Sequence, residues 1–487
     1  MFASTSNRAR AAIFLALLYA ALLAGCAVPL APGYQVEKEA LTVRFVAGAP
    51  PHLAIRADYQ LKNVGTTPLN LVEVTVPGGN AFGRANLRIL VASHEVTPQA
   101  EQSTDSDEPA ASLWRIPLAP ALREKQKLNV SLEYDLAAAT PTDPRIFAAE
   151  NMFYLNGSGW FPEFQEPKAL FAEDITRPNP TDLTIVTPAN FLVTASGQAH
   201  GEKKLRAETE HHFRISKDDL DPYVLGGQYN EQRVSTANGT VAVWTFKPIP
   251  AAQAQQTAAQ IAAAANLYSQ NFGPLPKSMK AVYDVELPQS TRDLISTEAA
   301  LLPGIVFEPA NPPGRPRKTS LGSFAVGNTW FGHIIRPSTE AWALDQGLDF
   351  YASTLSTAGK NPTQNADVAS ILSDYDAEHS QAVEKPLLSL TPNDSEAQLQ
   401  LGGDKMQLFF FALEDKCGQQ NVTHAIAHMV YALRGQQYGY NDFRAALEQE
   451  CHQNLAGFFR TWLTQKGIPA DFRARYENAS APQDQNH

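Results

Sequence analysis

Hydrophobic and polar residues alternate one by one along much of the first half of the chain. Between about residues 38 and 235, short alternating runs are separated by Gly, Pro, Asn and Asp; Leu41–Val46, Leu53–Ala57 and Leu128–Leu132 are examples. A period of two residues, broken by turn residues, is typical of antiparallel strands. We therefore expect an N-terminal antiparallel β domain, a sandwich or a saddle, over residues 38–240.

The pattern changes near residue 250. An Ala- and Gln-rich stretch from Pro250 to Asn271 places Ile261, Ala265 and Tyr268 on one stripe, which predicts a helix. A strand is expected at 280–285, a Pro-rich loop at 308–318, and mainly helices from residue 320. The chain is therefore predicted to be α+β and multidomain, with a second domain over 250–475 and a disordered tail over 477–487.

The first 25 residues have the features of an export signal. Arg8 and Arg10 precede 14 apolar residues, 11–24, a length that suits a signal peptide and is too short for a membrane span. The segment Leu23–Cys26 (LAGC) resembles the lipobox of bacterial lipoproteins, which implies a lipid on Cys26. The alternative is an ordinary signal peptide with a chance Cys.

The lipobox resemblance has consequences for location. We expect residues 26–37 to form a tether and the folded part to lie in the cell envelope. Ala27 in place of Asp favours the outer membrane, facing the periplasm, by resemblance to Gram-negative sorting rules. The membrane would then be a partner through the Cys26 lipid.

Charge and cysteine content bear on the partners of the chain and on its disulfides. A net charge of −11 argues against nucleic acid as a partner. Besides Cys26, the chain has only Cys417 and Cys451. In an oxidising compartment, a disulfide between these two is the default expectation. Two free, buried thiols are the alternative.

Several short motifs in the second half occur in an order known from one peptidase family. They are Phe272–Pro276 (FGPLP), Leu302–Val306 (LPGIV), Trp330–Pro337 (WFGHIIRP), Gly347–Leu348 with Tyr351–Ser353, and Phe458–Leu463 (FFRTWL) followed by Gly467–Pro469. This order resembles the gluzincin aminopeptidases, the M1-type family of the membrane alanyl aminopeptidase, over roughly residues 250–472. The resemblance implies a thermolysin-like α/β and helical peptidase-like domain after the β domain.

The same resemblance assigns the catalytic positions of that family to residues of this chain. The two zinc-binding His of HExxH correspond to Phe324 and Asn328, and the third zinc ligand corresponds to Gln346. The catalytic base corresponds to Ala325. The Glu that binds the substrate amine corresponds to Leu301, and the transition-state Tyr corresponds to Gly403. All six roles are lost, whereas Lys405 keeps the Lys that neighbours the Tyr. The chain therefore resembles a degenerate member that lacks HExxH.

These replacements remove the chemistry of a zinc peptidase. Zinc creates the nucleophile by lowering the pKa of its bound water, and aromatic or amide side chains do not replace imidazole and carboxylate as ligands. We expect no cofactor and no peptidase activity by this mechanism. Asn328 and Gln346 could hydrogen-bond across the former metal site; alternatively, both meet water.

Three functions remain open from the sequence. The first is a pseudoenzyme that binds peptide or protein, or scaffolds an envelope complex. The second is a metallopeptidase with a non-standard metal site, for which His424 and His428 have helical ligand spacing. The third is a purely structural envelope protein in which Phe324 fills the cleft.

Overall fold

The computed structural model describes most of the chain after the predicted export signal. The described residues are 33–77, 84–101, 111–137, 146–149, 151–156, 160–164, 180–216, 222–236, 239–277, 279, 281–288, 304–309, 326–355, 364–380, 382–391 and 394–477. Cys26 and the signal segment are outside this set, so their roles stay predictions.

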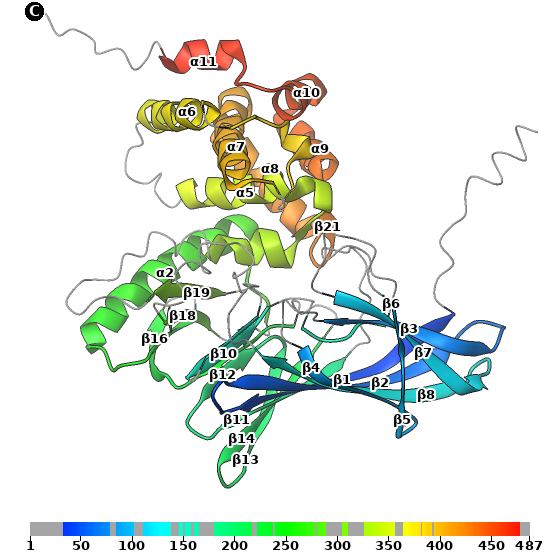
Figure 1. The fold of residues 1–487 in the computed structure, drawn as a ribbon. Helices are drawn as coiled ribbons and strands as arrows, with labels where there is room; N and C mark the ends of the chain where they lie inside the picture. Colours follow the sequence, from blue (N-terminus) through cyan, green and yellow to red (C-terminus); the bar gives the residue numbers. More distant parts are fainter. Residues whose placement is uncertain are drawn as a thin grey trace, which may run out of the picture.

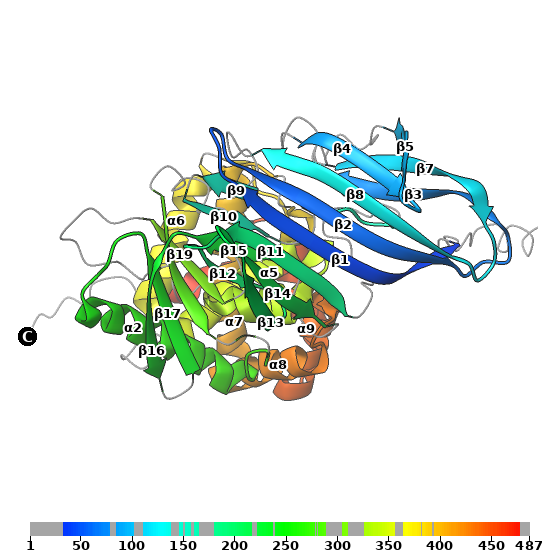
Figure 2. The same cartoon turned by 90° about the horizontal axis from the view of Figure 1, so that it is seen from below.

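A long, curved eight-stranded sheet dominates the N-terminal half (Figures 1 and 2). Its order is β13-β14-β11-β1-β2-β8-β4-β5. The strands are β1 (Tyr34–Val46), β2 (His52–Asn63), β4 (Arg84–Val91), β5 (His94–Val96), β8 (Lys127–Ala137), β11 (Thr181–Pro188), β13 (Gln198–Lys204) and β14 (Glu208–Ile215). The pairs are antiparallel, as predicted, except that β1 and β11 run parallel. Because β1 begins at Tyr34, the predicted tether at 26–37 is too long by four residues.

One face of this sheet is buried and the other faces solvent. Alternate residues of β1 and β2, such as Val43 and Ile55, point into a core shared with a three-stranded sheet of order β3-β7-β6. The strands of that sheet are β3 (Leu69–Pro77), β6 (Gln99–Glu101) and β7 (Ala111–Leu122). The alternation that predicted the strands is thus explained by one buried and one exposed face.

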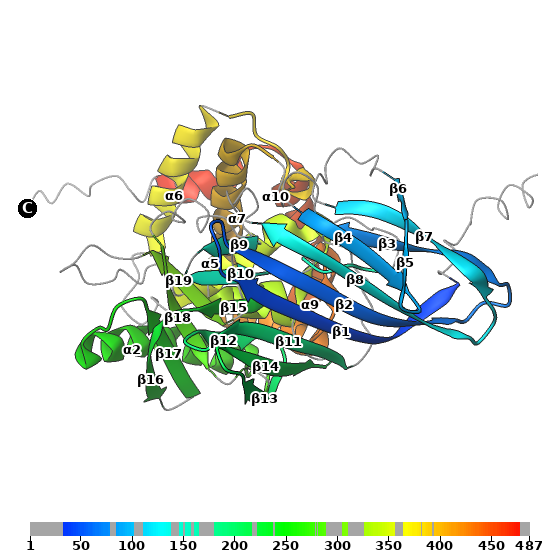
Figure 3. The same ribbon diagram turned by 60° about the horizontal axis from the view of Figure 1, so that its bottom comes forward.

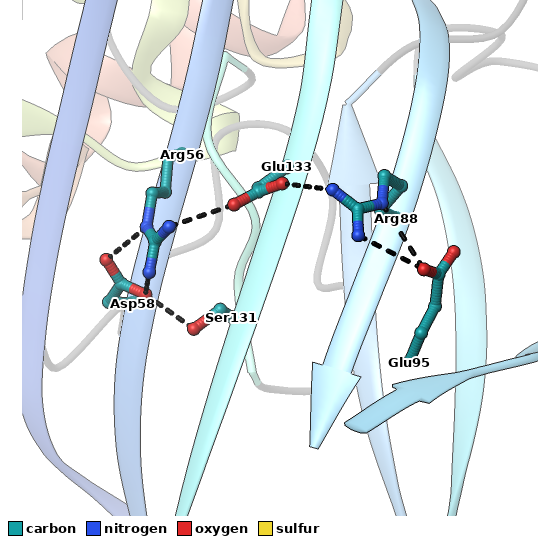
Figure 4. Close-up of polar contacts among 6 residues, drawn as sticks. All are labelled: Arg56, Asp58, Arg88, Glu95, Ser131 and Glu133. Atoms are coloured by element: carbon teal, nitrogen blue, oxygen red, sulfur yellow. Dashed lines mark hydrogen bonds and ion pairs between the residues drawn. The ribbon is translucent and has the colours of Figure 1, made fainter. Parts of the chain in front are cut away.

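The exposed face carries a ladder of alternating charges across four strands (Figure 4). Arg56 donates to Asp58 at 2.8 Å and to Glu133 at 2.9 Å, and Arg88 donates to Glu133 at 3.0 Å and to Glu95 at 3.1 Å. Arg56 and Glu133 are directly opposite each other on β2 and β8. Each charge is therefore matched by its cross-strand neighbour.

Two four-stranded sheets connect the β half to the helices. The first has the order β12-β15-β10-β9 and the second β16-β17-β18-β19. Their strands are β9 (Ile146–Ala149), β10 (Met152–Leu155), β12 (Leu192–Ala195), β15 (Val224–Gly227), β16 (Asn230–Thr236), β17 (Gly239–Thr245), β18 (Val282–Leu287) and β19 (Ile305–Pro309). Their facing residues, including Tyr154, Trp244 and Phe307, form one shared core.

The predicted domain boundary at residue 240 is wrong by about ten residues. β17 pairs in parallel with β18, so the β16–β17 hairpin belongs to the sheet of the second domain. The hairpin shows the same alternation as the strands before it, and a local pattern does not identify the sheet that a hairpin joins. The predicted strand at 280–285 is present as β18, beginning two residues later.

Helices form the rest of the molecule and lie to one side of the sheets (Figures 1 and 3). They are α2 (Ala251–Phe272), α5 (Trp342–Leu355), α6 (Gln364–His379), α7 (Glu396–Cys417), α8 (Gln419–Ala432), α9 (Tyr440–Cys451), α10 (Ala456–Thr464) and α11 (Ala470–Glu477). Short segments between them are the π-helix η4 (Thr329–Ile334), the 3-10 helices η5 (Thr339–Ala341) and η6 (Leu387–Ser389), and the paired strands β20 (Arg336–Pro337) and β21 (Gln437–Tyr438). The predicted helix at 250–271 and its buried stripe are confirmed in α2.

The largest core cluster joins α2, η4 and the C-terminal helices. Cys417 and Cys451 form the predicted disulfide, which links the end of α7 to the end of α9. α11 includes Glu477, so the predicted tail begins no earlier than residue 478, which is outside the described part. None of the described helices has the length and apolar character needed to cross a membrane. The α+β multidomain prediction is confirmed.

Candidate functional site

Three of the six predicted site positions lie on neighbouring elements. Asn328 directly precedes η4, Gln346 is on α5 and Gly403 is on α7, and α5 packs against both η4 and α7. Leu301, Phe324 and Ala325 lie outside the described residues. The proposal that Phe324 fills the site therefore stays a prediction.

Two side-chain hydrogen bonds hold the start of η4. The indole Nε1 of Trp330 donates to the carbonyl of Gly273, directly after α2, at 2.9 Å. The hydroxyl of the buried Thr329 accepts from the backbone N–H of Gly304, directly before β19, at 2.9 Å. Inserted π-helical turns occur often at functional sites. Here the turn fixes the position of Asn328 relative to the sheet and to α2.

Asn328 forms a hydrogen-bonded crosslink from the start of η4 to α5. Its side chain is only 8% exposed, and its Nδ2 donates to the carboxylate Oδ2 of the fully buried Asp349 at 3.2 Å. Gly332 is close to it, because a Cβ at that position would lie 2.7 Å from the Asn328 amide nitrogen. The amide is therefore enclosed by its own helix and by α5.

The predicted amide pair of Asn328 with Gln346 is wrong in its partner. Among the described residues, Asn328 bonds to Asp349, one helical turn beyond Gln346, and Gln346 is only half-buried. The alternative, in which Asn328 meets water, also fails because the side chain is buried.

A second buried carboxylate, Asp345, shares a face of α5 with Asp349. The two aspartates are four residues apart, so they lie on the same side of the helix. The hydroxyl of the buried Tyr438 donates to Asp345 at 2.7 Å. Burial raises the pKa of Asp345 to about 6, although the bond from Tyr438 lowers it. The region around Asn328 therefore contains a polar layer of amide, carboxyl and phenol groups.

Sequence reasoning missed both aspartates, although a signal was available. They flank Gln346 in the segment LDQGLDF, at the spacing of one helical face. A search for paired acidic residues on the predicted helix would have found this pair.

Two glycines near the site differ in the space around them. A Cβ at Gly347 of α5 would lie 2.2 Å from Met406 of α7, so this glycine permits the two helices to cross closely. Among the described residues, a Cβ at Gly403, which the motif resemblance assigns to the family's Tyr, would meet no atom within 4 Å. The described part of the chain therefore leaves the space beside Gly403 open.

Lys405, the retained family residue, has a structural role. Its Nζ is fully buried and donates to Glu384 Oε1 at 2.7 Å and to the carbonyl of Gln465 at 2.5 Å. The other oxygen of Glu384 accepts from the N–H of Gly467 at 2.6 Å. Burial lowers the pKa of Lys405, and Glu384 opposes this shift. Lys405 thus ties α7 to the chain before η6 and to the turn after α10.

We compared the chain with family models, curated proteins and solved structures. No family model matches the chain, and no curated protein matches it. Solved structures do match. The M1 zinc metallopeptidase from Deinococcus radiodurans has 15% identity and a TM-score of 0.62, over 90% of this chain and 96% of that one. The chain has the fold of an M1 zinc metallopeptidase.

Mutant forms of the Deinococcus radiodurans enzyme match equally well. One, bound to a Tyr-Ser-Ala substrate, gives a TM-score of 0.60 over 90% of this chain and 96% of that one, at 15% identity. The M1 likeness therefore extends over nearly the whole length of both chains. It agrees with the predicted order of β domain and peptidase-like domain.

Among the described residues, those that the motif resemblance assigns to the zinc ligands do not fit a zinc ion. Zinc in proteins is bound by Cys, His, Asp or Glu, whereas Asn328 and Gln346 offer amides, and the Asn328 amide is engaged with Asp349. Within the described ranges, no group of three or more His, Cys, Asp or Glu is placed to hold a metal. Asn328 and Gln346 are therefore not suited to bind zinc.

His424 and His428, the residues of the non-standard metal hypothesis, lie elsewhere. Both are exposed on α8, whereas Asn328 is buried beside α5. The structure does not bring the two histidines together with the residues at the M1 zinc positions.

Proposed function

We propose that this chain is a lipid-anchored protein of the aminopeptidase fold that has lost zinc hydrolysis and functions by binding. The observation that carries the proposal is the crosslink from Asn328 to Asp349. It occupies, with an amide–carboxylate hydrogen bond, the position that the motif resemblance assigns to a zinc ligand of the fold's enzymes. An amide committed to a carboxylate offers neither a Lewis acid nor a route to an activated water.

The proposed ligand is a peptide or a protein segment, or the chain scaffolds an envelope complex through the same site. The open space beside Gly403 supports this, because the family Tyr has been replaced by no side chain at all. The related Deinococcus radiodurans structure with a bound Tyr-Ser-Ala substrate shows that this fold accommodates a short peptide. Fold alone does not fix function, so the proposal depends on direct tests of cleavage and binding.

The cleavage test uses fluorogenic aminoacyl and peptide substrates with the full chain. We expect no release of fluorophore above the uncatalysed rate, with or without added zinc. A chelator should change nothing. Zinc-dependent release that a chelator abolishes would refute the loss of catalysis and favour the metallopeptidase alternative.

The binding test uses a steric block with a matched control. A Tyr-Ser-Ala peptide carrying a fluorophore at its C-terminus would be titrated into the wild type, Gly403→Trp and Gly457→Trp. Both glycines are helical and have open space around them, but Gly457 lies on α10. We expect Gly403→Trp alone to weaken binding, by at least about tenfold. Equal affinities in all three proteins would contradict a peptide site beside Gly403.

Lipid anchoring on Cys26 is the second part of the proposal. It rests on the lipobox-like segment LAGC after an apolar stretch of signal-peptide length. The wild type should partition with the outer membrane and be extracted only by detergent. Cys26→Ser should release the chain or leave it with an uncleaved signal. A Cys26→Ser protein that fractionates and migrates like the wild type would contradict the anchor.

A further inference from the structure

Two histidines of α8 share one solvent-facing side of the helix. His424 and His428 are both exposed, whereas Ala425, Ile426 and Met429 are buried in the core. Side chains four residues apart on an α-helix are neighbours, with Cβ atoms about 5–6 Å apart. The two imidazoles are therefore adjacent and both reach solvent.

Both rings are available to a ligand. In the part of the chain that the structure describes, neither His424 nor His428 takes part in a hydrogen bond, ion pair or ring contact. The nitrogen of a neutral imidazole suits Zn²⁺, Cu²⁺ and Ni²⁺. The pair thus offers two suitable donors that no other described group occupies.

The helix that carries the pair is fixed at both ends. The Cys417–Cys451 disulfide immediately precedes α8 and attaches it to the end of α9. Just after α8, the guanidinium of Arg434 donates to the carbonyl of Pro274 at 2.9 Å. Because the backbone is held in place before any ion arrives, little conformational entropy is lost when both rings bind one ion.

We propose that His424 and His428 form a surface chelate for a divalent transition-metal ion. Cu²⁺ binds most tightly, and Ni²⁺ and Zn²⁺ bind less tightly, following the general order of affinities for nitrogen ligands. The described residues provide no third His, Cys, Asp or Glu for a larger cluster, so water completes the coordination. This site is separate from the residues at the M1 zinc positions, and it does not depend on the proposed function.

Calorimetric titration of the full chain with Cu²⁺, Ni²⁺ and Mg²⁺ tests the proposal. The wild type should bind one Cu²⁺ at a site that takes Ni²⁺ more weakly and does not take Mg²⁺, which prefers oxygen ligands. His424→Gln and His428→Gln should each weaken Cu²⁺ binding by at least about tenfold, because one imidazole alone loses the effective concentration of the second. The double variant should lose little more Cu²⁺ affinity than either single variant.

The matched control replaces two exposed histidines that are not paired. His94 on β5 and His200 on β13 lie on opposite edges of the eight-stranded sheet. His94→Gln/His200→Gln should keep the wild-type Cu²⁺ affinity, and its bound Cu²⁺ should show two nitrogen ligands in electron paramagnetic resonance. A wild-type affinity in His428→Gln, or an equal loss in the control, would overturn the chelate.

Discussion

At the residue scale, hydrogen bonds within the protein hold the region around Asn328 together. The hydrogen bond from Asn328 to Asp349 connects η4 to α5. The hydroxyl of Tyr438 donates to a second buried carboxyl group, that of Asp345. Buried polar groups require partners, so these bonds stabilise an arrangement that the family stabilises with an ion. The sequence indicated which positions had changed, but it did not indicate their partners, because a hydrogen bond depends on the turn of the helix as well as on the helix itself.

Replacement of Lys405 should be severely destabilising. Lys405→Met leaves the carboxylate of Glu384 buried without its ammonium partner. Removing one member of a buried ion pair costs about 3–5 kcal/mol of unfolding free energy. Glu384→Gln in the same background should recover part of that loss, as measured by urea unfolding. A change below about 0.5 kcal/mol in Lys405→Met would contradict the structural role.

Asp404 should destabilise the protein at neutral and alkaline pH. The carboxyl is buried, one of its oxygens has no hydrogen-bond donor among the described residues, and Asp374 and Glu378 on α6 face it. Burial raises its pKa to about 6 in the folded chain, as do both carboxylates, whereas Gln400 lowers it. The unfolded value is about 3.9. The folded state therefore holds this proton more tightly, and stability falls as pH rises from about 4 through about 6.

Asp404→Asn removes this pH dependence. Since the amide does not ionise, the variant should match the wild type near pH 4 and exceed its unfolding free energy by about 2 kcal/mol at pH 8. Urea unfolding at both pH values measures the difference. Asp182→Asn, at an exposed position of β11, is the control and should change little at either pH. An equal effect of Asp404→Asn at pH 4 and pH 8 would rule out the buried carboxylate as its cause.

At the scale of elements, the helices were predicted better than the strand partners. The Ala-rich α2 was predicted from its local pattern because a helix bonds within itself. Sheet membership depends on distant segments. The β16–β17 hairpin joins β18, and β1 pairs in parallel with β11, whose paired residues lie 142 positions further along the chain. No local pattern carries that information. For the same reason, the close crossing of α5 and α7 at Gly347 was not foreseen.

Two alanine substitutions test whether Gly347 is tightly packed and whether Gly403 has free space beside it. Gly347→Ala should lower the unfolding free energy by about 1–3 kcal/mol, because its Cβ would overlap Met406 and Phe410. Gly403→Ala should be neutral or should stabilise by up to about 1 kcal/mol, since alanine is the better helix former and has room. Urea unfolding of both variants measures the contrast. Similar destabilisation by the two substitutions would contradict the open space beside Gly403.

The charge ladder of the eight-stranded sheet should contribute modestly and in a salt-dependent way. Glu133→Gln removes the carboxylate that bridges Arg56 and Arg88. Because the face is exposed, we expect a loss of only about 0.2–1 kcal/mol at low salt. Near 1 M salt the loss should shrink, because the Debye length falls to about 3 Å. A loss that does not respond to salt would indicate packing rather than charge.

At the scale of the whole molecule, the order of short motifs carried more information than any single motif. Neither a family model nor a curated protein matches this chain, yet solved structures at 15% identity share its fold over 90% of its length. Turns and packing glycines such as Gly347 preserve the fold, because they are set by backbone geometry. Residues that only bind a metal are required for chemistry and not for packing, so they can be replaced while the fold remains.

The central claim is that this fold persists here without its zinc. The most direct measurement is the zinc content of the His424→Gln/His428→Gln variant after zinc loading and gel filtration, because the proposed surface chelate then contributes nothing. We predict well below one zinc per chain, with no gain in thermal stability on loading. One tightly held zinc per chain, removed only by a strong chelator and located beside Asn328 and Gln346, would contradict the account.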